Sequence, residues 1–382
     1  MDIETLKRDF RAVYRQDPQV FRAPGRVNLI GEHTDYNEGF VMPAAIGFYT
    51  SAAIAPRSDT KVNVRSQSFE GAVSFDIADD LRPKHNWSDY VVGVIDQVKR
   101  SGERLRGLDI LIQGDVPIGA GLSSSAAIEV AVGFALLNAE HATIDRVRLA
   151  LLCQRAENEF VGMRCGIMDQ FISCNGQRNH ALMLDCRNLQ FKLLPISPGA
   201  SIVICNTMVK HQHASGEYNQ RRADCEQGVR LLQECEPGIR SLRDVSVEQL
   251  ERHREMLPPV IYRRCRHVVT ENARVESAAE MLQKNDLRAF GGLMAKSHMS
   301  LRDDYEVSCR ELDVMVEIAT AQAGVFGARM TGGGFGGCTI NLVASEHAEA
   351  FRKRVAAEYE RAIGLKPDVY ITSAADGAAR VA

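Results

Sequence analysis

An α+β fold arranged in two lobes is the fold class predicted by this sequence of 382 residues. Short β-rich segments broken by Gly, Pro, Asn and Asp fill the first third of the chain. From about residue 217 onward, apolar residues recur at helical spacing instead. Because a domain usually holds about 100–200 residues, two lobes suit this length, and we expect them at 1–185 and 186–382.

The first lobe is expected to begin with four strands, at 20–31, 39–56, 61–66 and 72–77. A helix at 88–100 follows, with Ser88 as its candidate N-cap. Segment 107–115 predicts a further strand, and helices are expected at 123–140 and 144–160. The sequence PIGAGLSSS lies between that strand and the first of these two helices.

The second lobe is expected to be mainly helical after strand-like pieces at 180–186 and 201–206. Four helices are predicted, at 217–236, 259–284, 286–298 and 308–322. A glycine-rich segment at 327–344, a helix to about residue 364 and a closing strand at 368–373 complete the chain.

Composition and charge argue against several classes of protein. Hydrophobic residues make up 45% of the chain and charged residues 25%, as in ordinary globular proteins. The net charge is −3, so we expect no nucleic-acid partner. No stretch reaches the ~20 apolar residues of a membrane span, and the acidic N-terminus is unlike a signal peptide, so we expect no membrane association. Ten cysteines without a C-x-x-C pair indicate reduced thiols, a cytoplasmic location and no zinc site; no pattern implies an obligate protein partner.

The glycine-rich stretch PIGAGLSSS, at 117–125, is placed between a strand and a helix. Small residues let backbone N–H groups approach phosphate oxygens, and the following helix N-terminus adds partial positive charge. The alternative is a simple turn with serine N-caps. The chain contains no Gly-Lys dipeptide, which excludes a Walker A loop, so a phosphate site here belongs to another nucleotide-binding family.

A second stretch, at 23–43, concentrates polar side chains around a Gly turn between apolar strands. They are Arg26, Asn28, Glu32, His33, Asp35 and Tyr36. Acceptors and donors of several geometries suit a ligand with many hydroxyls, because each hydroxyl both donates and accepts. A polar hairpin loop is the alternative. A metal site is disfavoured because no fourth ligand is visible.

A third stretch, TGGGFGGC at 331–338, formally contains G-x-G-x-x-G. It precedes a β-like segment instead of opening a helix, so it fails as a dinucleotide-binding fingerprint. Glycines flanked by strands suggest close backbone approach to another segment or a ligand, with a glycine hairpin as the alternative. Farther upstream, Asp169 lies in the apolar setting CGIMDQF, where a carboxylate needs a partner; it can also be structural.

Together these stretches resemble the galactokinase family of the GHMP small-molecule kinases. GRVNLIGEHTDY resembles the sugar-loop motif of the family, VPIGAGLSSSAA its phosphate loop and RMTGGGFGGC its third motif, in the family's order. CGIMDQ and SGEYNQRR resemble two further family segments. The resemblance implies two lobes with the active site in the cleft between them. It also implies ATP-dependent phosphorylation of α-D-galactose at the anomeric hydroxyl, giving α-D-galactose 1-phosphate and ADP, with Mg²⁺ as cofactor.

The same resemblance assigns roles by position. It implies sugar-binding residues at Glu32, His33, Thr34, Asp35, Gly166 and Tyr218. It implies ATP-binding residues at Trp87, Gly119, Ala120, Gly121, Leu122, Ser123, Ser124 and Ser125. Ser125 and Glu157 match Mg²⁺ ligands; Asp169 matches the catalytic base, with Arg26 beside it to hold it ionised and stabilise the transferring phosphoryl group.

Three other functions are weighed against this one. A kinase for N-acetylgalactosamine or another sugar would differ in the residues around C2 of the sugar, which the sequence does not locate. A non-catalytic galactose and ATP sensor is disfavoured because the serine run and Asp169 are intact. A nicotinamide-dependent dehydrogenase rests only on the formal G-x-G-x-x-G pattern.

Overall fold

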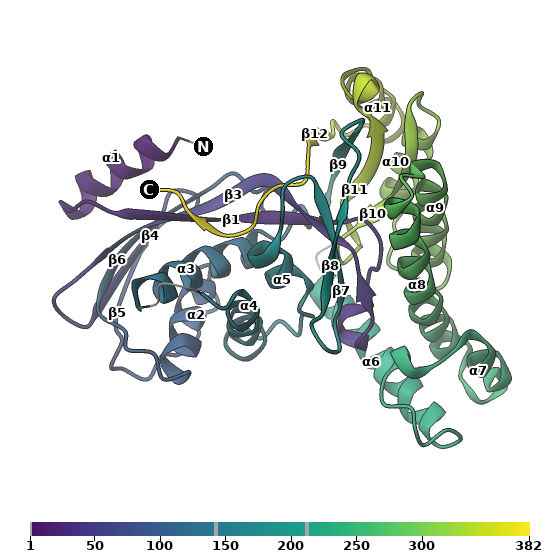
Figure 1. The fold of residues 1–382 in the computed structure, drawn as a ribbon, viewed down its shortest axis with the longest axis horizontal. Helices are drawn as coiled ribbons and strands as arrows, with labels where there is room; N and C mark the ends of the chain where they lie inside the picture. Colours follow the sequence, from purple (N-terminus) through teal and green to yellow (C-terminus); the bar gives the residue numbers. More distant parts are fainter. Residues whose placement is uncertain (1, 141–143, 211–213) are drawn as a thin grey trace.

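The computed structural model describes residues 2–140, 144–210 and 214–382. Within these ranges the strands form a six-stranded, a four-stranded and a three-stranded sheet. Figure 1 shows the two larger sheets in two lobes set side by side, with the small sheet where the lobes meet. The α+β fold in two lobes is therefore confirmed.

The first lobe is built on the six-stranded sheet, whose strand order is β13-β1-β3-β6-β4-β5. In sequence order these strands are β1 (Gln19–Asn28), β3 (Pro43–Pro56), β4 (Lys61–Ser66), β5 (Ala72–Asp76), β6 (Leu108–Gly114) and β13 (Ala379–Arg380). The β1–β3 register shifts between Pro24 and Arg26. Because such an irregularity re-aims the side chains of a strand, it bears on the direction of Arg26.

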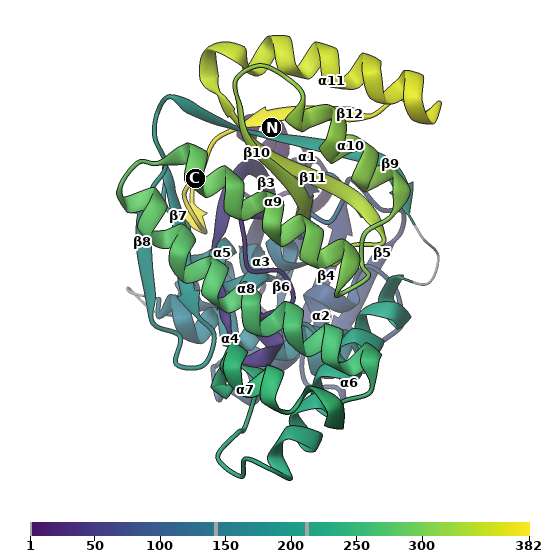
Figure 2. The same cartoon turned by 90° about the vertical axis from the view of Figure 1, so that its right-hand side faces the viewer.

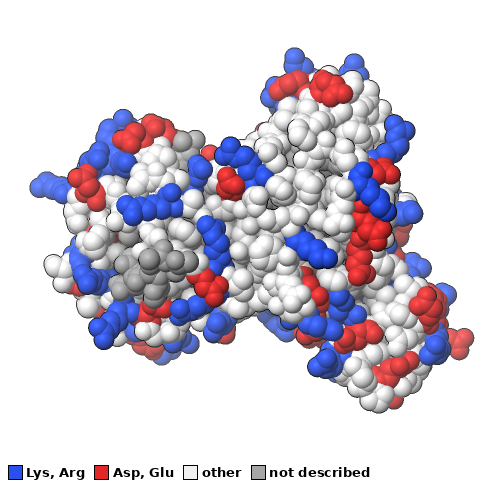
Figure 3. Space-filling model, in the orientation of Figure 1, with Lys and Arg blue, Asp and Glu red and all other residues white. Residues whose placement is uncertain are grey.

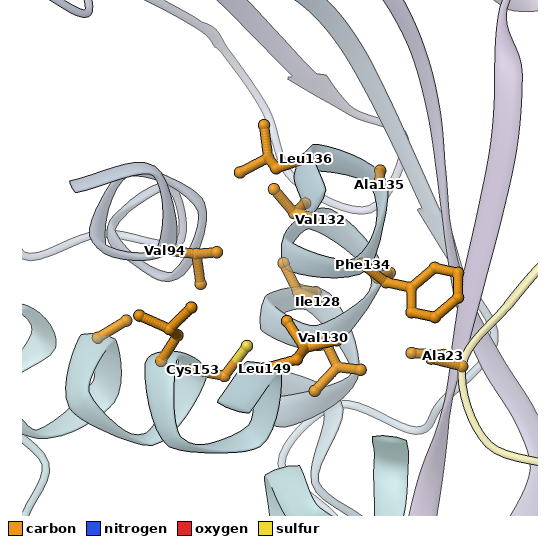
Figure 4. Close-up of a cluster of buried hydrophobic side chains, with 14 of the residues drawn as sticks. Ala23, Val94, Ile128, Val130, Val132, Phe134, Ala135, Leu136, Leu149 and Cys153 are labelled. Carbon is orange, nitrogen blue, oxygen red and sulfur yellow. The ribbon is translucent and has the colours of Figure 1, made fainter. Parts of the chain in front are cut away.

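Helices cover both faces of this sheet. On one face lie α2 (Asp89–Arg100), α3 (Ser124–Glu140), α4 (Arg146–Arg155) and α5 (Met168–Asn175), and on the other lies α1 (Ile3–Tyr14) (Figure 1). The helix α3 carries apolar residues on all its faces, as expected for a helix that is buried on all sides. In Figure 4, Phe134 of α3 points toward Ala23 of β1, while Leu149 and Cys153 of α4 approach from the opposite side.

The second lobe is built on the four-stranded sheet, in the order β10-β11-β9-β12. Its strands are β9 (Ala200–Lys210), β10 (Val325–Thr331), β11 (Gly336–Ala344) and β12 (Asp368–Thr372). Along β9, Val203 and Cys205 face α10 (Arg310–Thr320) and α11 (Ala348–Ile363). The alternate residues Ile202 and Ile204 face the opposite core, with the pleat's period of two.

That opposite core is shared by the two lobes. It joins Val27 and Leu29 of the first lobe with Ile204 of β9 and Phe290 of the long helical pair. This pair consists of α8 (Pro259–Gln283) and α9 (Leu287–Asp303), which cross the front of Figure 2. A continuous apolar core between the lobes fixes the cleft whose walls carry the polar motifs.

The remaining elements are a small sheet, two helices and several single helical turns. The three-stranded sheet contains β2 (Phe40–Val41), β7 (His180–Asp185) and β8 (Phe191–Pro195). The other helices are α6 (Ala214–Gln233) and α7 (Val247–Arg252), with single helical turns at Asp35–Asn37, Ala156–Val161, Leu242–Asp244, Arg254–Met256 and Ser345–His347. The lobe boundary predicted at 185/186 falls directly after β7 and stays a prediction. The last strand, β13, returns to pair with β1.

Several local features differ from the sequence predictions, which included neither β8 nor the helices α5 and α7. The helix α1 was not predicted, although Asp2 caps it through the Glu4 and Thr5 N–H groups and Leu6 and Phe10 are buried one turn apart. The helix expected at 144–160 begins at Arg146 and changes at Ala156 into a π-helical turn. Ser88 occupies the N-cap of α2 but makes no capping hydrogen bond with its side chain.

Surface charge follows the mixed composition. On the face drawn in Figure 3, Lys and Arg alternate with Asp and Glu, and neither sign forms one continuous field. Among the residues that the structure describes, no helix is both long and apolar enough to cross a membrane.

Candidate active site

The centre of the cleft is an ion pair between Arg26 of β1 and Asp169 in the first turn of α5. The Arg26 Nε and Nη2 atoms each donate to one Asp169 carboxylate oxygen, at 2.8 Å. The Arg26 side chain is 7% exposed and that of Asp169 is 26% exposed, so the carboxylate faces the cleft. Burial opposes the charge of Arg26, but Asp169 and then Glu32 raise the pKa of its guanidinium.

This pair is tied to the phosphate loop by two further hydrogen bonds. Arg26 Nη1 donates to the Gly121 carbonyl oxygen, and the Ser123 hydroxyl donates to Asp169 Oδ2. Ser123 has φ 58°, a left-handed conformation that costs free energy for a residue with a side chain. The hydrogen bond from Ser123 to Asp169 is thus made from a strained backbone conformation.

Glu32 lies in the loop that follows β1. Its Oε1 atom accepts from the Gly332 N–H at 2.8 Å and from the Thr331 hydroxyl at 3.2 Å. Burial raises the pKa of Glu32 even though Arg329 and Arg26 lower it. The third glycine motif thus anchors the first polar stretch across the two lobes.

His33 is held by aromatic side chains. Its Nδ1 lies 2.7 Å from the Tyr36 hydroxyl, which lies 2.8 Å from the Tyr305 hydroxyl. The Tyr218 ring centroid is 5.4 Å from that of His33. Burial lowers the pKa of His33 to about 3, so its imidazole is neutral near pH 7.

Asp35 packs directly against Gly166. A Cβ atom at Gly166 would lie 1.9 Å from Asp35 Oδ2, so only glycine fits there without movement. The Asp35 Oδ1 atom accepts from the Tyr36 N–H at 3.0 Å. Burial and then the neighbouring Asp169 charge raise the pKa of Asp35 to about 7.

These groups surround a cavity of about 390 Å³, which we call the sugar-side cavity because the sequence predicts a polyhydroxyl ligand there. Its lining residues are Arg26, Glu32, His33, Asp35, Glu157, Met163, Cys165, Gly166, Met168, Asp169, Tyr218, Gly332 and Gly333. Thr34 is absent from this lining. Its hydroxyl donates to the Gly31 and Phe40 carbonyl oxygens instead, so Thr34 holds the loop closed.

The phosphate loop and the third glycine motif lie back to back. A Cβ atom at Gly332 would lie 3.1 Å from the Gly121 carbonyl oxygen, and one at Gly337 would lie 3.3 Å from that of Ala120. The expected close approach of glycines to another segment is therefore observed. Gly119 and Gly121 have φ 69° and 76°, which favour glycine. The helix α3 begins at Ser124, within the last residues of this loop.

A second cavity, of about 510 Å³, lies on the other side of Arg26 and Asp169. We call it the nucleotide-side cavity, and its lining residues are Arg26, Phe69, Trp87, Tyr90, Ile118, Gly119, Gly121, Leu122, Ser123, Ser124, Ser125, Ile128 and Asp169. Ala120 is not among them, because its side chain is buried in the core between the lobes. The Phe69 and Trp87 rings are stacked, with centroids 5.6 Å apart and planes 8° apart.

Four lining residues of this cavity were not among the predicted site residues: Phe69, Tyr90, Ile118 and Ile128. Phe69 is a lone aromatic residue in a polar segment, and Tyr90 lies within a predicted amphipathic helix, where its apolar body passes for core. An aromatic residue outside any predicted strand or helix was the available signal for Phe69. For Tyr90 the sequence offered none.

Ser125 and Glu157 come together beside the phosphate loop. Burial and then Asp169 raise the pKa of Glu157 to about 7, while hydrogen bonds from Cys165, Gln170 and Ser125 lower it. A cation beside these buried carboxylates would offset the repulsion between their negative charges. A hydroxyl oxygen and a carboxylate oxygen are ligands that suit Mg²⁺. The described residues contain no group of three His, Cys, Asp or Glu side chains that could hold a metal alone. Substrate oxygens and water are therefore needed to complete a Mg²⁺ site here.

Comparison with known proteins agrees with this geometry. Residues 8–56 match the galactokinase galactose-binding signature. Residues 89–177 match the GHMP kinases N terminal domain, and residues 278–361 match the GHMP kinases C terminal domain. A curated galactokinase of Roseiflexus sp. is 46% identical over 382 residues, covering 100% of this chain and 98% of the relative. One of Chloroflexus aurantiacus is 46% identical over 378 residues, covering 98% of this chain and 97% of the relative.

Solved structures give the same result. Lactococcus lactis galactokinase, complexed with galactose, superposes with a TM-score of 0.93 at 37% identity, covering 99% of this chain and 100% of that one. Methanococcus jannaschii mevalonate kinase superposes with a TM-score of 0.67 at 17% identity, covering 95% and 100%. The second likeness concerns the fold alone.

Proposed function

The chain belongs to the galactokinase family of GHMP kinases, and we propose that it transfers the γ-phosphoryl group of ATP to the anomeric hydroxyl of α-D-galactose. The observation that carries this proposal is that Arg26 and Asp169 line both cavities. A sugar in one cavity and a triphosphate in the other would meet at this pair. The products are α-D-galactose 1-phosphate and ADP.

Galactose binds through groups that are already fixed in place. Glu32 and Asp35 supply carboxylate oxygens, and neutral His33 supplies a ring nitrogen to the sugar hydroxyls. Tyr218 covers the His33 ring and contributes apolar surface for the C–H face of the sugar. Because these polar groups are buried, a sugar that leaves them unpaired binds poorly, which gives discrimination.

The chemical step is an in-line displacement at the γ-phosphorus. The anomeric oxygen forms the new P–O bond and its proton passes to Asp169, while the β,γ-bridging oxygen leaves with ADP and the bonding electrons. Proton transfer to a placed carboxylate contributes roughly 10²- to 10⁴-fold in rate. Arg26 stabilises the charge on the transferring phosphoryl group through its guanidinium.

The triphosphate is held by the phosphate loop. Its backbone N–H groups and the N-terminus of α3 offer donors and partial positive charge in the absence of a Walker lysine. Ser125 and Glu157 would hold Mg²⁺, which would supply positive charge against the triphosphate. We do not assign Ser123 to the metal, because its hydroxyl is hydrogen-bonded to Asp169 and orients that carboxylate.

The other functions considered are not favoured, since the galactose-binding signature and the full-length galactokinase relatives agree with the intact site. We further propose that the chain works without an obligate protein partner. A cytoplasmic location is supported by the ten cysteines, which are all free thiols.

A coupled ADP-release assay over a panel of sugars tests the proposal. Galactose should give the highest kcat/KM, with turnover dependent on Mg²⁺. Higher kcat/KM for N-acetylgalactosamine, or galactose binding without ADP release from folded protein, would contradict it.

A further inference from the structure

A chain of buried polar side chains lies behind Glu157. Gln170, next to Asp169 in α5, is fully buried. Its Nε2 atom donates to Glu157 Oε2 at 2.6 Å and to Glu129 Oε2 at 3.0 Å. Both N–H bonds of one amide group are thus used on two carboxyl groups, and Glu129, on α3, is fully buried as well.

We propose that Gln170, backed by Glu129, is a positioning residue that fixes the Glu157 carboxyl group toward the divalent cation accompanying ATP. This inference rests on the proposed function, because it takes Glu157 as a ligand of that cation. It adds two residues that do not line either cavity of the cleft.

The geometry explains why Glu157 needs such support. Glu157 lies in a π-helical turn, and the terminal torsion of a glutamate side chain has a broad energy minimum. The Gln170 hydrogen bond removes this freedom. Gln170 adjoins Asp169 in α5, and Glu129 lies one helical turn after Ser125 in α3. The network therefore connects the proposed base, the helix after the phosphate loop and the π-helical turn.

Two buried oxygens of this network still need a hydrogen-bond partner. Gln170 Oε1 and Glu129 Oε1 have no hydrogen-bond partner among the described residues. A neutral Glu129 carries one hydroxyl donor, and Gln170 Oε1 is an acceptor of the kind it needs. In agreement, burial and then the Glu157 charge raise the pKa of Glu129 well above its usual range. A glutamine at position 129 would offer an amide donor in the same place.

The test uses binding instead of turnover. Trp87, the one tryptophan in the sequence, lines the nucleotide-side cavity, so its fluorescence reports ADP binding to the full-length protein. The measured quantity is the ratio of the ADP dissociation constants without and with Mg²⁺. In wild type Mg²⁺ should tighten ADP binding. In Gln170→Met that tightening should fall roughly 10- to 100-fold, with the Mg²⁺-free dissociation constant unchanged.

Gln97→Met is the matched control. Gln97 is also a buried glutamine, and its Nε2 donates to Glu159 of the same π turn at 3.0 Å. This variant loses an amide hydrogen bond to the same turn without touching Glu157, so it should keep the wild-type Mg²⁺ effect. Glu129→Gln should keep most of it, whereas Glu129→Met should lose it. This pair decides the question even where Gln170→Met does not fold.

Three outcomes would overturn the proposal: Gln170→Met or Glu129→Met with the full Mg²⁺ effect, Gln97→Met with an equal loss, or wild type without any Mg²⁺ effect. A failure of the proposed function is a different result. Wild type would then bind ADP with Mg²⁺ dependence but form no sugar phosphate.

Discussion

The two cavities that meet at Arg26 and Asp169 are built from different chemistry. The sugar-side cavity is walled by ionisable groups, among them buried Glu32 and His33 and half-buried Asp35, each fixed by hydrogen bonds or close packing. The nucleotide-side cavity has aromatic and aliphatic walls and a floor of loop backbone, with Ile118 52% exposed at its edge.

This difference assigns different tasks to the two sides. Buried polar groups lose free energy whenever a ligand leaves them unpaired, so the sugar side discriminates between hydroxyl patterns. Aromatic surfaces can stack on any flat ring, and backbone N–H groups can donate to any phosphate oxygen. The nucleotide side therefore binds its ligand with less selectivity. Changes on the sugar side should therefore cost more activity than changes on the nucleotide side.

The largest effect is expected where the two sides meet. Asp169→Asn removes the proposed proton acceptor, so kcat should fall roughly 10²- to 10⁴-fold while galactose and ATP still bind. Steady-state kinetics and calorimetric binding measure both. The control is Asp109→Asn, which breaks the ion pair between buried Asp109 and Arg57, 3.1 Å apart and outside the cleft. That variant should lose stability but keep kcat. Near-normal kcat for Asp169→Asn would remove Asp169 from the role of base.

A smaller loss should follow from a change on the sugar side alone. In Gly166→Ala the new Cβ atom displaces Asp35, so kcat/KM for galactose should fall about 10²-fold with little change in the KM for ATP. Gly292→Ala, in α9 with open space around its Cβ position, should leave both parameters unchanged. An equal rise of both KM values in Gly166→Ala would contradict the separation of the two sides.

The corresponding change on the nucleotide side is Trp87→Ala. Loss of the stacked ring should raise the KM for ATP about ten-fold and leave the KM for galactose unchanged. Trp87→Phe should restore most of the affinity because it keeps an aromatic face beside Phe69. If the KM for galactose rose by the same factor, the two cavities would not be independent.

The smallest predicted effect concerns pH. The folded-state pKa of Asp35 is raised to about 7, against about 3.9 for an unfolded aspartate, so the folded state binds more protons between these values. Asp35 therefore lowers stability as the pH rises through about 4–7. Without ligand, the thermal midpoint of Asp35→Asn minus that of wild type should increase by roughly 2 °C or more between pH 5 and pH 8.

The exposed Asp79→Asn serves as the control and should follow wild type at both pH values. An unchanged difference between wild type and Asp35→Asn across this range would show that Asp35 is ionised in the free cleft. The contrast between the two sides would then rest on geometry alone.

Most of the fold and much of the candidate site could be predicted from local sequence patterns. Strand and helix periods located the main elements of both lobes, because each buries one face or is buried throughout. Glu32, His33 and Asp35 were predictable because they fall in one short loop. Thr34 in the same loop shows the limit, since neighbouring loop residues cannot all face the cavity and one of them closes the loop itself.

The residues that sequence reasoning missed come from tertiary packing. Tyr305 reaches His33 through Tyr36 from the other lobe, and Gln170 reaches Glu129 across 41 residues of chain. Neither has a local pattern that distinguishes it from core. Phe69 completes a stack with Trp87 only because the segment before β5 folds over α2's N-terminus. These contacts are visible only once the chain is folded.

The central claim is that the two cavities deliver the anomeric hydroxyl and the γ-phosphoryl group to one carboxylate. Phosphorus and proton NMR of the product formed from ATP, Mg²⁺ and galactose tests it most directly. The phosphoryl group should be attached to the anomeric oxygen of the α-sugar, with one ADP formed for each sugar phosphate. Phosphate on another hydroxyl, or ADP formed without any sugar phosphate, would contradict the account.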